Sequence, residues 1–319
     1  MSIALVTGAT GFAGSHLLDQ LLQQGSLDLV AWGRPSGRPL PSGVSPRLAW
    51  RAVDITDREA VAHALDGTLP AVVYHCAGVA AVQSAFNDSA RALRVNAFGT
   101  HVLLTELARR GFAGTVLVTG SALVYRPSAE PLREDAPIAP STPYGLSKLA
   151  QEMIALDTAG VRVILARPFN HAGPRQGDEF VTSSFARQIA EAEAGLRAPV
   201  LRVGNLDARR DVTDVRDTVR AYRLLVEHGR PRTPYNVCRG EAYRVGDLLE
   251  RLLQRARLGI TVEPDAARLR PSDNPVVLGS AARIQADCGW TPRIPIEQTL
   301  GDLLDYWRQA VSLSPEPRG

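Results

Sequence analysis

The chain has 319 residues, of which 45% are hydrophobic and 22% charged, and its formal net charge is +3. This is the composition of a globular protein long enough for two domains, or for one large α/β unit with an appended lobe. The basic residues are dispersed, which argues against nucleic acid as a partner, and no stretch of sequence is apolar enough to span a membrane.

The three cysteines, Cys76, Cys238 and Cys288, follow neither a metal-binding spacing nor a disulfide framework. We therefore predict no metal site and expect a reducing, cytoplasmic compartment. The N-terminal Met-Ser-Ile-Ala-Leu-Val run soon meets a glycine turn, which indicates a strand and not a signal peptide.

A glycine-rich turn follows the first predicted strand, residues 3–6, and precedes a helical pattern. Its glycines are Gly8, Gly11 and Gly14, in the spacing Gly-x-x-Gly-x-x-Gly. Such a turn lets the free N–H groups of a helix N-terminus approach a pyrophosphate. A turn between a strand and a helix can also be purely structural, but this context favours dinucleotide binding. We expect Phe12, inside the turn, to contact the same cofactor.

The second predicted strand, residues 27–32, ends without an acidic residue. NAD sites usually place Asp or Glu there to bind the ribose 2′-hydroxyl. This chain instead has Arg34 and Arg38. Their positive charge suits a 2′-phosphate, so the sequence favours NADP(H); NAD(H) remains an alternative if both arginines are solvated loop charges.

The third and fourth predicted strands, residues 48–53 and 71–75, both end at expected cofactor contacts. After the third strand, we expect Asp54 to hydrogen-bond the adenine amine and Ile55 to lie beside it. After the fourth, the small side chain of Ala77 allows close approach of the cofactor, although small residues there could equally serve tight packing.

Two further polar residues are predicted to have structural roles. Asp57 is placed to cap the next helix. Asn96 lies early in a helical pattern, where asparagine is mildly unfavourable, so we expect its side chain to make a buried hydrogen bond.

Ser121 follows the fifth predicted strand, residues 115–119, at the end of the sheet where open α/β folds bind ligands. Tyr144 and Lys148 then lie four residues apart in a helix predicted to begin after Ser141 or Thr142, with Pro143 as its first residue, and to end at Gly160. A positive charge near a phenol lowers its pKa and gives an acid–base group. The spacing alone is also common on solvated helix faces.

Strands and helices alternate through a sixth predicted strand, residues 161–166, which predicts a doubly wound parallel Rossmann sheet. We assign residues 1–169 to this cofactor-binding domain. Residues 170–319 are predicted to form a smaller mixed C-terminal lobe for the substrate, with helices at 180–194, 214–229, 246–257 and 296–310. A late strand at 235–238 is expected to return to the first sheet.

Several motifs together resemble the extended short-chain dehydrogenases/reductases that act on nucleotide sugars: the glycine turn, Ser121, Tyr144-x-x-x-Lys148 and Arg167-Pro-Phe-Asn170. Longer strings are similar to the branch of GDP-mannose 4,6-dehydratases and GDP-4-keto-6-deoxymannose reductases. These strings are at 167–176, 204–211, 235–238 and 270–273.

The resemblance implies catalytic roles for Ser121, Tyr144 and Lys148. Ser121 would hydrogen-bond the sugar C4 oxygen, and Tyr144 would exchange a proton with that oxygen. Lys148 would hold the nicotinamide ribose and bias Tyr144 toward ionisation.

The resemblance also implies a diphosphate site in the second lobe. Asn170 would position the sugar diphosphate, and Arg210 and Arg270 would neutralise it, because a guanidinium binds phosphate in a bidentate manner. Arg209 is a further phosphate partner in this scheme. Each arginine could instead form a surface ion pair, with Asp211 or Asp273, and Asp273 could hold a ribose hydroxyl.

Leu123 decides between two activities of this branch. A 4,6-dehydratase needs a second acid–base residue, which in those enzymes is a carboxylate two residues after the Ser/Thr. Leucine at that position predicts a reductase, which would convert GDP-4-keto-6-deoxy-mannose to GDP-rhamnose or its C4 epimer. The alternatives are a nucleotide-sugar 4,6-dehydratase, a 4-epimerase with tightly held NAD, a reductase of a thymidine-linked 4-keto sugar and a non-catalytic nucleotide sensor.

Two departures from the family pattern, Arg126 and His75-Cys-Ala-Gly78, are expected near the sugar pocket and bear on substrate identity. By the same resemblance we expect a homodimer or tetramer, formed through the exposed faces of the helices at 96–109 and 143–159.

Overall fold

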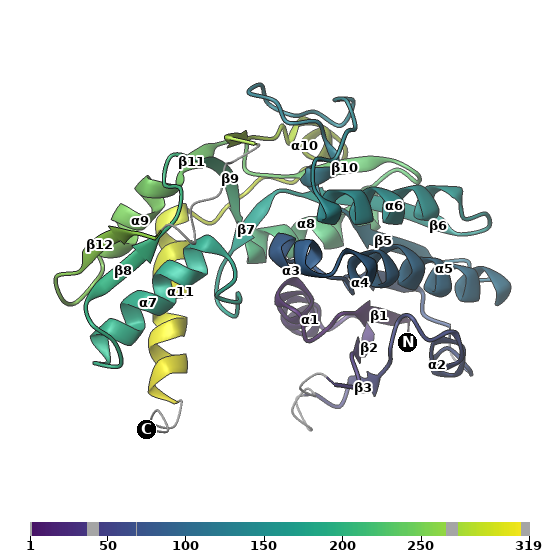
Figure 1. Cartoon of the computed structure of the whole chain (residues 1–319). Helices are drawn as coiled ribbons and strands as arrows, with labels where there is room; N and C mark the ends of the chain where they lie inside the picture. Colours follow the sequence, from purple (N-terminus) through teal and green to yellow (C-terminus); the bar gives the residue numbers. More distant parts are fainter. Residues whose placement is uncertain (1, 37–44, 68, 266–273, 314–319) are drawn as a thin grey trace.

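The computed structural model describes residues 2–36, 45–67, 69–265 and 274–313. Its main element is a seven-stranded sheet in which every neighbouring pair of strands is parallel (Figure 1). In spatial order the strands are β10 (Pro234–Val237), β6 (Arg162–Pro168), β5 (Thr115–Thr119), β4 (Val72–His75), β1 (Ile3–Thr7), β2 (Asp28–Gly33) and β3 (Leu48–Ala52).

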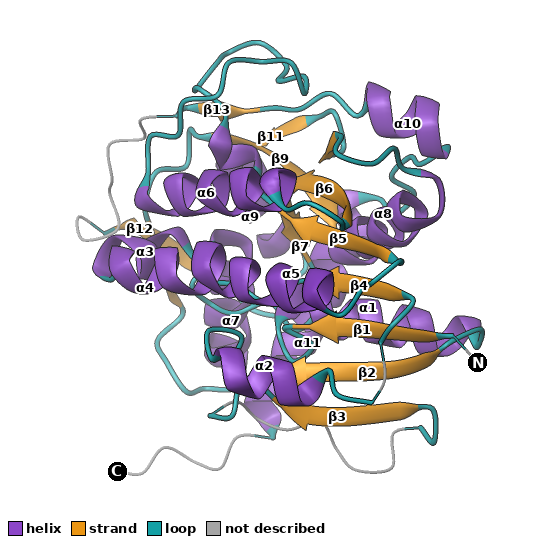
Figure 2. Cartoon of the chain, turned by 90° about the vertical axis from the view of Figure 1, so that its right-hand side faces the viewer, coloured by secondary structure: helices purple, strands orange, loops and turns teal. Residues whose placement is uncertain are grey.

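Helices cover both faces of this sheet (Figure 2). One face packs against α1 (Phe12–Gln24), α8 (Val215–His228) and α10 (Ala282–Cys288). The other packs against α2 (Arg58–Ala64), α5 (Gly99–Arg109) and α6 (Pro143–Asp157). Around α6 lie α3 (Val82–Asn87), α4 (Ser89–Leu93), the π-helix η1 (Arg94–Phe98) and the 3₁₀ turn η2 (Ala122–Val124).

The second lobe has its own apolar core, beside a small mixed sheet. In this sheet β9 (Arg209–Asp214) pairs with β7 (Asn170–Ala172) and β13 (Val276–Val277) in parallel and with β11 (Ala242–Arg244) antiparallel. A separate parallel pair joins β8 (Val200–Val203) to β12 (Thr261–Pro264). The helices of the lobe are α7 (Val181–Glu193), α9 (Val245–Leu253) and α11 (Ile296–Ser312) (Figure 1).

The predicted doubly wound fold is confirmed. The strand order has the central reversal between β1 and β4 that characterises dinucleotide-binding sheets. The late strand predicted at 235–238 joins this sheet as β10, beside β6. Helices α8 and α10 also pack on the large sheet, although both belong to the second half of the chain. Within the described residues, no helix is long and apolar enough to cross a membrane.

Helix α6 begins as predicted but ends early. Thr142 caps it, because its hydroxyl accepts a hydrogen bond from Gly145 N at 3.0 Å. The helix was expected to run to Gly160, but it ends at Asp157. Thr158 is already extended. Its N–H makes the last bond of the helix, to Ile154 O at 3.1 Å, and its hydroxyl donates to the same carbonyl at 2.8 Å.

The segment around Asn96 differs from the regular helix that was expected. Residues 94–98 form a π-helix between α4 and α5, and Asn96 is fully buried there. Its side chain accepts from Val79 N at 2.8 Å and donates to Ser147 Oγ at 2.9 Å, so the predicted buried hydrogen-bonding role is confirmed. Asp57 caps α2 as predicted, accepting from Glu59 N and Ala60 N.

A buried ion pair fixes α6 against the sheet. Arg167, in β6, donates from Nε to Glu152 Oε2 at 2.9 Å, and a second guanidinium nitrogen bonds the other carboxylate oxygen. Arg167 also donates to the Tyr125 hydroxyl at 2.8 Å, and that hydroxyl donates to Asn236 Oδ1 in β10 at 2.7 Å. The network therefore joins α6, two strands and the segment after Ser121.

Glu152→Gln should lower the free energy of unfolding by about 3 kcal/mol, because it leaves the buried Arg167 guanidinium without its counter-charge. Urea unfolding followed by circular dichroism measures this change. The matched control is Glu227→Gln, which removes a partly exposed i,i+4 pair with Arg223 and should change the stability by about 0.5 kcal/mol or less. Equal losses in the two variants would contradict the structural role of Arg167.

Candidate active site

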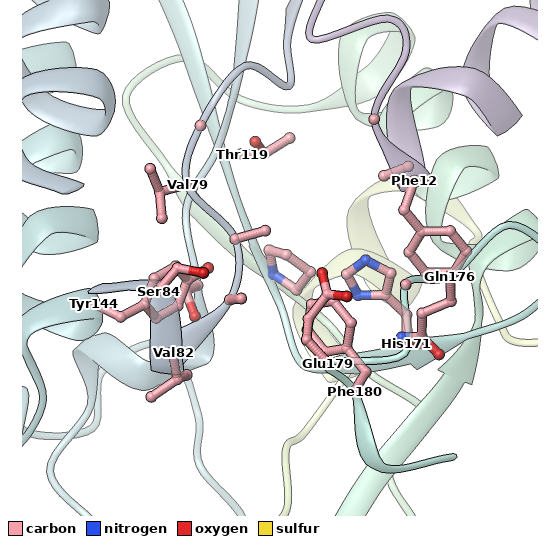
Figure 3. A pocket seen from close by; sticks show the side chains of 18 of the residues that line it. Phe12, Val79, Val82, Ser84, Thr119, Tyr144, His171, Gln176, Glu179 and Phe180 are labelled. Carbon is pink, nitrogen blue, oxygen red and sulfur yellow. The ribbon is translucent and has the colours of Figure 1, made fainter. Parts of the chain in front are cut away.

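A cleft of about 1830 Å³ lies at the carboxyl ends of the parallel strands and is lined by both lobes. The first lobe contributes the turns after β1, β2, β4 and β5 and the start of α6. The second lobe contributes the segment between β7 and α7 together with parts of β8 and β9. Figure 3 shows the middle of this cleft, with Tyr144 on one wall and Phe12 and His171 on the other.

The glycine turn after β1 forms one end of the cleft. Gly8 has a φ of +66°, and a Cβ there would lie 2.6 Å from Ala77 N, so only glycine fits. A Cβ on Gly14 would lie 2.2 Å from Gly8 O. No side chain caps the α1 N-terminus at Gly11, so its N–H groups remain available to a ligand. This cradle fits the pyrophosphate of a dinucleotide.

The residues predicted to hold the adenosine part of the cofactor line the same cleft. Arg34 lies at the end of β2, where no carboxylate is present, and Arg38 lies outside the described residues. Asp54 lines the cleft and accepts from Thr56 N and Thr56 Oγ1, both at 2.8 Å, which holds its carboxylate in place. Ile55 is buried beside it.

The structure brings Ser121, Tyr144 and Lys148 together in the cleft wall, all of them buried. A Cβ on Gly145 would lie 2.3 Å from Leu123 O, so the start of α6 presses directly on the segment after Ser121. Tyr144 hydrogen-bonds Ser121. Lys148 donates from Nζ to Thr119 O at 2.9 Å.

Burial governs the protonation of Tyr144. It raises the pKa of the phenol to about 12, and the hydrogen bond with Ser121 only partly opposes this rise. That Lys148 biases the phenol toward ionisation stays a prediction. Burial lowers the pKa of Lys148 to about 8. At neutral pH the site therefore holds a protonated phenol and an ammonium, which suits proton donation to an oxygen.

The second lobe places Asn170 and Arg210 on the cleft wall. Arg210 donates to Arg209 O at 2.8 Å, and burial lowers the pKa of its guanidinium. Asp211, weighed as an ion-pair partner, instead accepts backbone N–H groups, from Arg239, Gly240 and Gly279. Arg270 and Asp273 lie outside the described residues.

Several cleft residues were not identified from the sequence. Figure 3 shows Ser84 near Tyr144, and Gln176, Glu179 and Phe180 on the second-lobe side. Phe12 stacks on His171 with ring centroids 5.5 Å apart, which connects the cofactor turn to the second lobe. The second-lobe residues among them could have been found from their position in the sequence, because residues 171–180 directly follow the Arg167-Pro-Phe-Asn motif.

Leu123 lines the cleft, so the position that would carry a dehydratase carboxylate faces the site and holds an apolar side chain. Arg126, expected near the sugar pocket, lies elsewhere: it is exposed and borders a small surface pocket formed by residues 126–137. The second departure from the family pattern is the segment His75-Cys-Ala-Gly78. Its last three residues line the cleft, and His75 is buried behind them.

Comparisons with known proteins agree with this geometry. The family model described as GDP-mannose 4,6 dehydratase matches residues 5–303. The chain is 39% identical over 312 residues to the GDP-6-deoxy-D-mannose reductase of Pseudomonas aeruginosa, covering 96% of this chain and 97% of that protein.

Two solved structures share the fold over the whole chain. The structure of RMD from Pseudomonas aeruginosa complexed with NADPH has a TM-score of 0.85 at 37% identity, covering 97% of this chain and 100% of that one. The UDP-glucose 4-epimerase of Thermus thermophilus complexed with NAD has a TM-score of 0.83 at 26% identity, covering 97% and 99%. From its motifs, its cleft and these matches, the chain belongs to the GDP-mannose 4,6 dehydratase family.

Proposed function

We propose that the chain is an NADP(H)-dependent oxidoreductase that reduces the C4 ketone of a nucleotide-linked 4-keto-6-deoxyhexose. The proposed substrate is GDP-4-keto-6-deoxy-mannose, and the product is GDP-rhamnose or its C4 epimer. The observation that carries the proposal is a protonated, buried Tyr144 beside Ser121 and Lys148, with Leu123 where a dehydratase needs an acid. The 39% identity to a GDP-6-deoxy-D-mannose reductase supports the reductase over the other activities of the family.

The cofactor would lie along the first-lobe side of the cleft. Gly8, Gly11, Phe12 and Gly14 would hold its pyrophosphate, and Ala77 would lie close to it. Asp54 and Ile55 would contact the adenine, and Arg34 the 2′-phosphate. When bound, this cofactor supplies a hydride to C4 of the sugar. The NADPH bound in the similar Pseudomonas structure supports this choice of cofactor.

The protein's own chemistry would be proton donation. Tyr144 gives the phenolic proton to the C4 oxygen, and Ser121 hydrogen-bonds the same oxygen and orients it. Lys148 binds the ribose hydroxyls and stabilises the phenolate that forms when Tyr144 has lost its proton. Burial of all three side chains strengthens these interactions because it excludes water.

The nucleotide sugar would lie on the second-lobe side. Asn170 would position the diphosphate, and Arg210 and Arg270 would neutralise it, with Asp273 on a ribose hydroxyl. In this arrangement residues 1–169 form the cofactor part and 170–319 the substrate part of the site. Glu179 adds a carboxylate that faces the cleft, where it can accept hydrogen bonds from sugar hydroxyls (Figure 3).

A panel of 4-keto-6-deoxy nucleotide sugars, incubated with NADPH, tests the proposal. We expect loss of NADPH absorbance with the GDP-linked 4-keto-6-deoxymannose, and NMR of the product gives its C4 configuration.

Tyr144→Phe should lower kcat by at least 100-fold, because the proton donor is lost, while NADPH binding stays within a few-fold of wild type.

The panel should include GDP-mannose with NADP⁺. We expect no 4-keto product, because Leu123 stands where a dehydratase carries its carboxylate. Formation of a 4-keto product would contradict the reductase proposal. If the product formed with the wild-type chain but not with Glu179→Gln, Glu179 would be the acid–base residue of that elimination. A stoichiometric NAD that stays bound through purification would instead indicate a 4-epimerase.

Arg34→Ala should weaken NADPH binding by about tenfold or more and leave NADH binding nearly unchanged, because only NADPH carries the 2′-phosphate. Fluorescence titration with each cofactor measures both affinities. Equal losses for NADPH and NADH would show that Arg34 does not contact the 2′-phosphate. Arg51→Ala is a suitable control, because this exposed β3 arginine bonds Ala64 O and does not line the cleft.

We also propose that the chain is a cytoplasmic homodimer, or a tetramer built from such dimers. The α3, α4 and α6 helices lie beside one another on one side of the molecule (Figure 2), and η1 packs against α4 and α6; each of the four elements carries at least one exposed apolar side chain. These side chains are Phe86, Leu93, Phe98, Leu146 and Met153. Surface of this kind on packed helices is typical of a protein interface.

Met153→Asp should therefore convert the assembled protein to monomers, because a carboxylate cannot be buried in an apolar interface without a partner. Sedimentation velocity measures the change. Leu196→Asp, at a similarly exposed position beyond α7, should leave the assembly intact. A monomeric wild-type protein, or assembly unchanged by Met153→Asp, would contradict this interface.

A further inference from the structure

Lys148 is a buried ammonium held only by neutral groups. Besides Thr119 O, its Nζ donates to Gln151 Oε1 at 2.9 Å. No carboxylate lies within ion-pair distance of it in the part of the chain that the structure describes. A buried cation without a counter-charge is unfavourable unless its N–H groups are well bonded. The orientation of Gln151 therefore matters to the charge at the centre of the site.

The hydrogen-bond capacities around Gln151 allow one arrangement. Lys148 can only donate, so the oxygen of the Gln151 amide must face it. The amide nitrogen then donates to Thr100 Oγ1 at 2.9 Å. Thr100 donates its own proton to Asn96 O at 2.6 Å, so it can only accept from its other neighbours.

His75 completes this arrangement from the other side. Its Nε2 lies 2.8 Å from Thr100 Oγ1, and because Thr100 accepts, Nε2 carries the proton. Nδ1 then accepts from Thr7 Oγ1 at 2.8 Å. Thr7 Oγ1 accepts in turn from Ala77 N at 3.2 Å, in the turn that lines the cofactor cleft. Burial lowers the pKa of His75 to about 3, so the imidazole is neutral, as this arrangement requires.

We propose that Gln151, Thr100 and His75 are positioning residues for Lys148, forming a directional hydrogen-bond chain that runs from the ammonium to the Thr7–Ala77 cofactor turn. This hydrogen-bond chain leaves the remaining N–H of the ammonium to face the cleft. The inference rests on the proposed function in one respect, that a nicotinamide cofactor is the ligand which Lys148 binds.

A neutral amide at position 151 has a specific consequence. It bonds the ammonium without neutralising it, so the positive charge acts on the cofactor ribose and on Tyr144. The neighbouring Glu152 could not serve in its place, because its carboxylate is already paired with Arg167. A carboxylate at 151 would pair with Lys148 and could no longer donate to Thr100.

Lys148 is the group in this region that changes charge between neutral and mildly alkaline pH. The titratable groups around it are His75 and Cys76 at the end of β4 and Tyr144 in α6. The other elements packed here contribute neutral groups, which are Thr119 after β5, Asn96 in η1 and Thr100 in α5. Burial raises the pKa values of Cys76 and Tyr144 to about 12. A decline of NADPH affinity near pH 8 therefore reports deprotonation of Lys148.

The test is a fluorescence titration of NADPH at a series of pH values from about 6 to 10. For the wild-type chain we expect the affinity to fall with a midpoint near the Lys148 pKa of about 8. Gln151→Leu should move this midpoint down by about one pH unit, because the ammonium loses an acceptor. Gln151→Glu should move it up by about one unit or more, because a carboxylate stabilises the ammonium.

Two kinds of control separate positioning from general damage to the fold. Gln188→Leu removes another buried glutamine, which accepts from Arg202 N in the second lobe, and should leave the midpoint in place. Thr100→Ser keeps the hydroxyl and should match wild type, whereas Thr100→Val removes it and should shift the midpoint as Gln151→Leu does. If Gln151→Leu does not fold, the comparison of Thr100→Ser with Thr100→Val tests the positioning role on its own.

A wild-type midpoint in both position-151 variants, or in Thr100→Val, would overturn the inference. The binding assay needs no sugar substrate, so the two proposals fail separately. Shifted midpoints without reduction of any 4-keto sugar would leave the positioning chain intact and contradict the reductase. Reduction with unmoved midpoints would contradict only the positioning chain, and failure of the wild-type chain to bind NADPH would overturn both.

Discussion

The buried Arg167–Glu152 pair is the constraint on which the site depends, because it sets the position of α6 against the sheet. Glu152 follows Lys148 by one helical turn, so the pair fixes the part of α6 that carries the catalytic side chains. Through Tyr125 and Asn236 the same network reaches β10 and the segment after Ser121. One charge pair thus determines where three functional groups stand relative to the cleft.

Two buried cations on adjacent elements are treated in opposite ways. Arg167 has a bidentate carboxylate partner and is fixed in one orientation, which suits a structural role. In the part of the chain that the structure describes, Lys148 donates to neutral acceptors, so its charge is not neutralised, and burial lowers its pKa to about 8. A counter-ion at Lys148 would stabilise the fold but would reduce the potential that the lysine exerts on Tyr144. The unpaired lysine is consistent with selection for function rather than for stability.

The local features of the fold and site were predictable from the sequence, and the non-local ones were not. The glycine turn, the Thr142 cap and the Tyr144–Lys148 spacing depend on residues close in sequence. By contrast, the chain through His75, Thr100 and Gln151 joins residues up to 76 positions apart, counting from 75 to 151. Nor could spacing show that Arg126 lies outside the cleft, or that burial would raise the pKa of Tyr144.

The protonation states at the site favour reduction over elimination. Reduction of a ketone needs a proton donor at one oxygen, and a buried phenol with a pKa of about 12 is protonated at neutral pH without any further partner. Elimination needs in addition a base at C5 and an acid at the C6 hydroxyl, and on the Tyr144 wall the corresponding position is Leu123. Glu179 faces the cleft from the second lobe, on the wall opposite Tyr144 in Figure 3. A carboxylate there can hold sugar hydroxyls, but it does not stand at position 123, two residues after Ser121, where the similar dehydratases carry their additional acid–base residue.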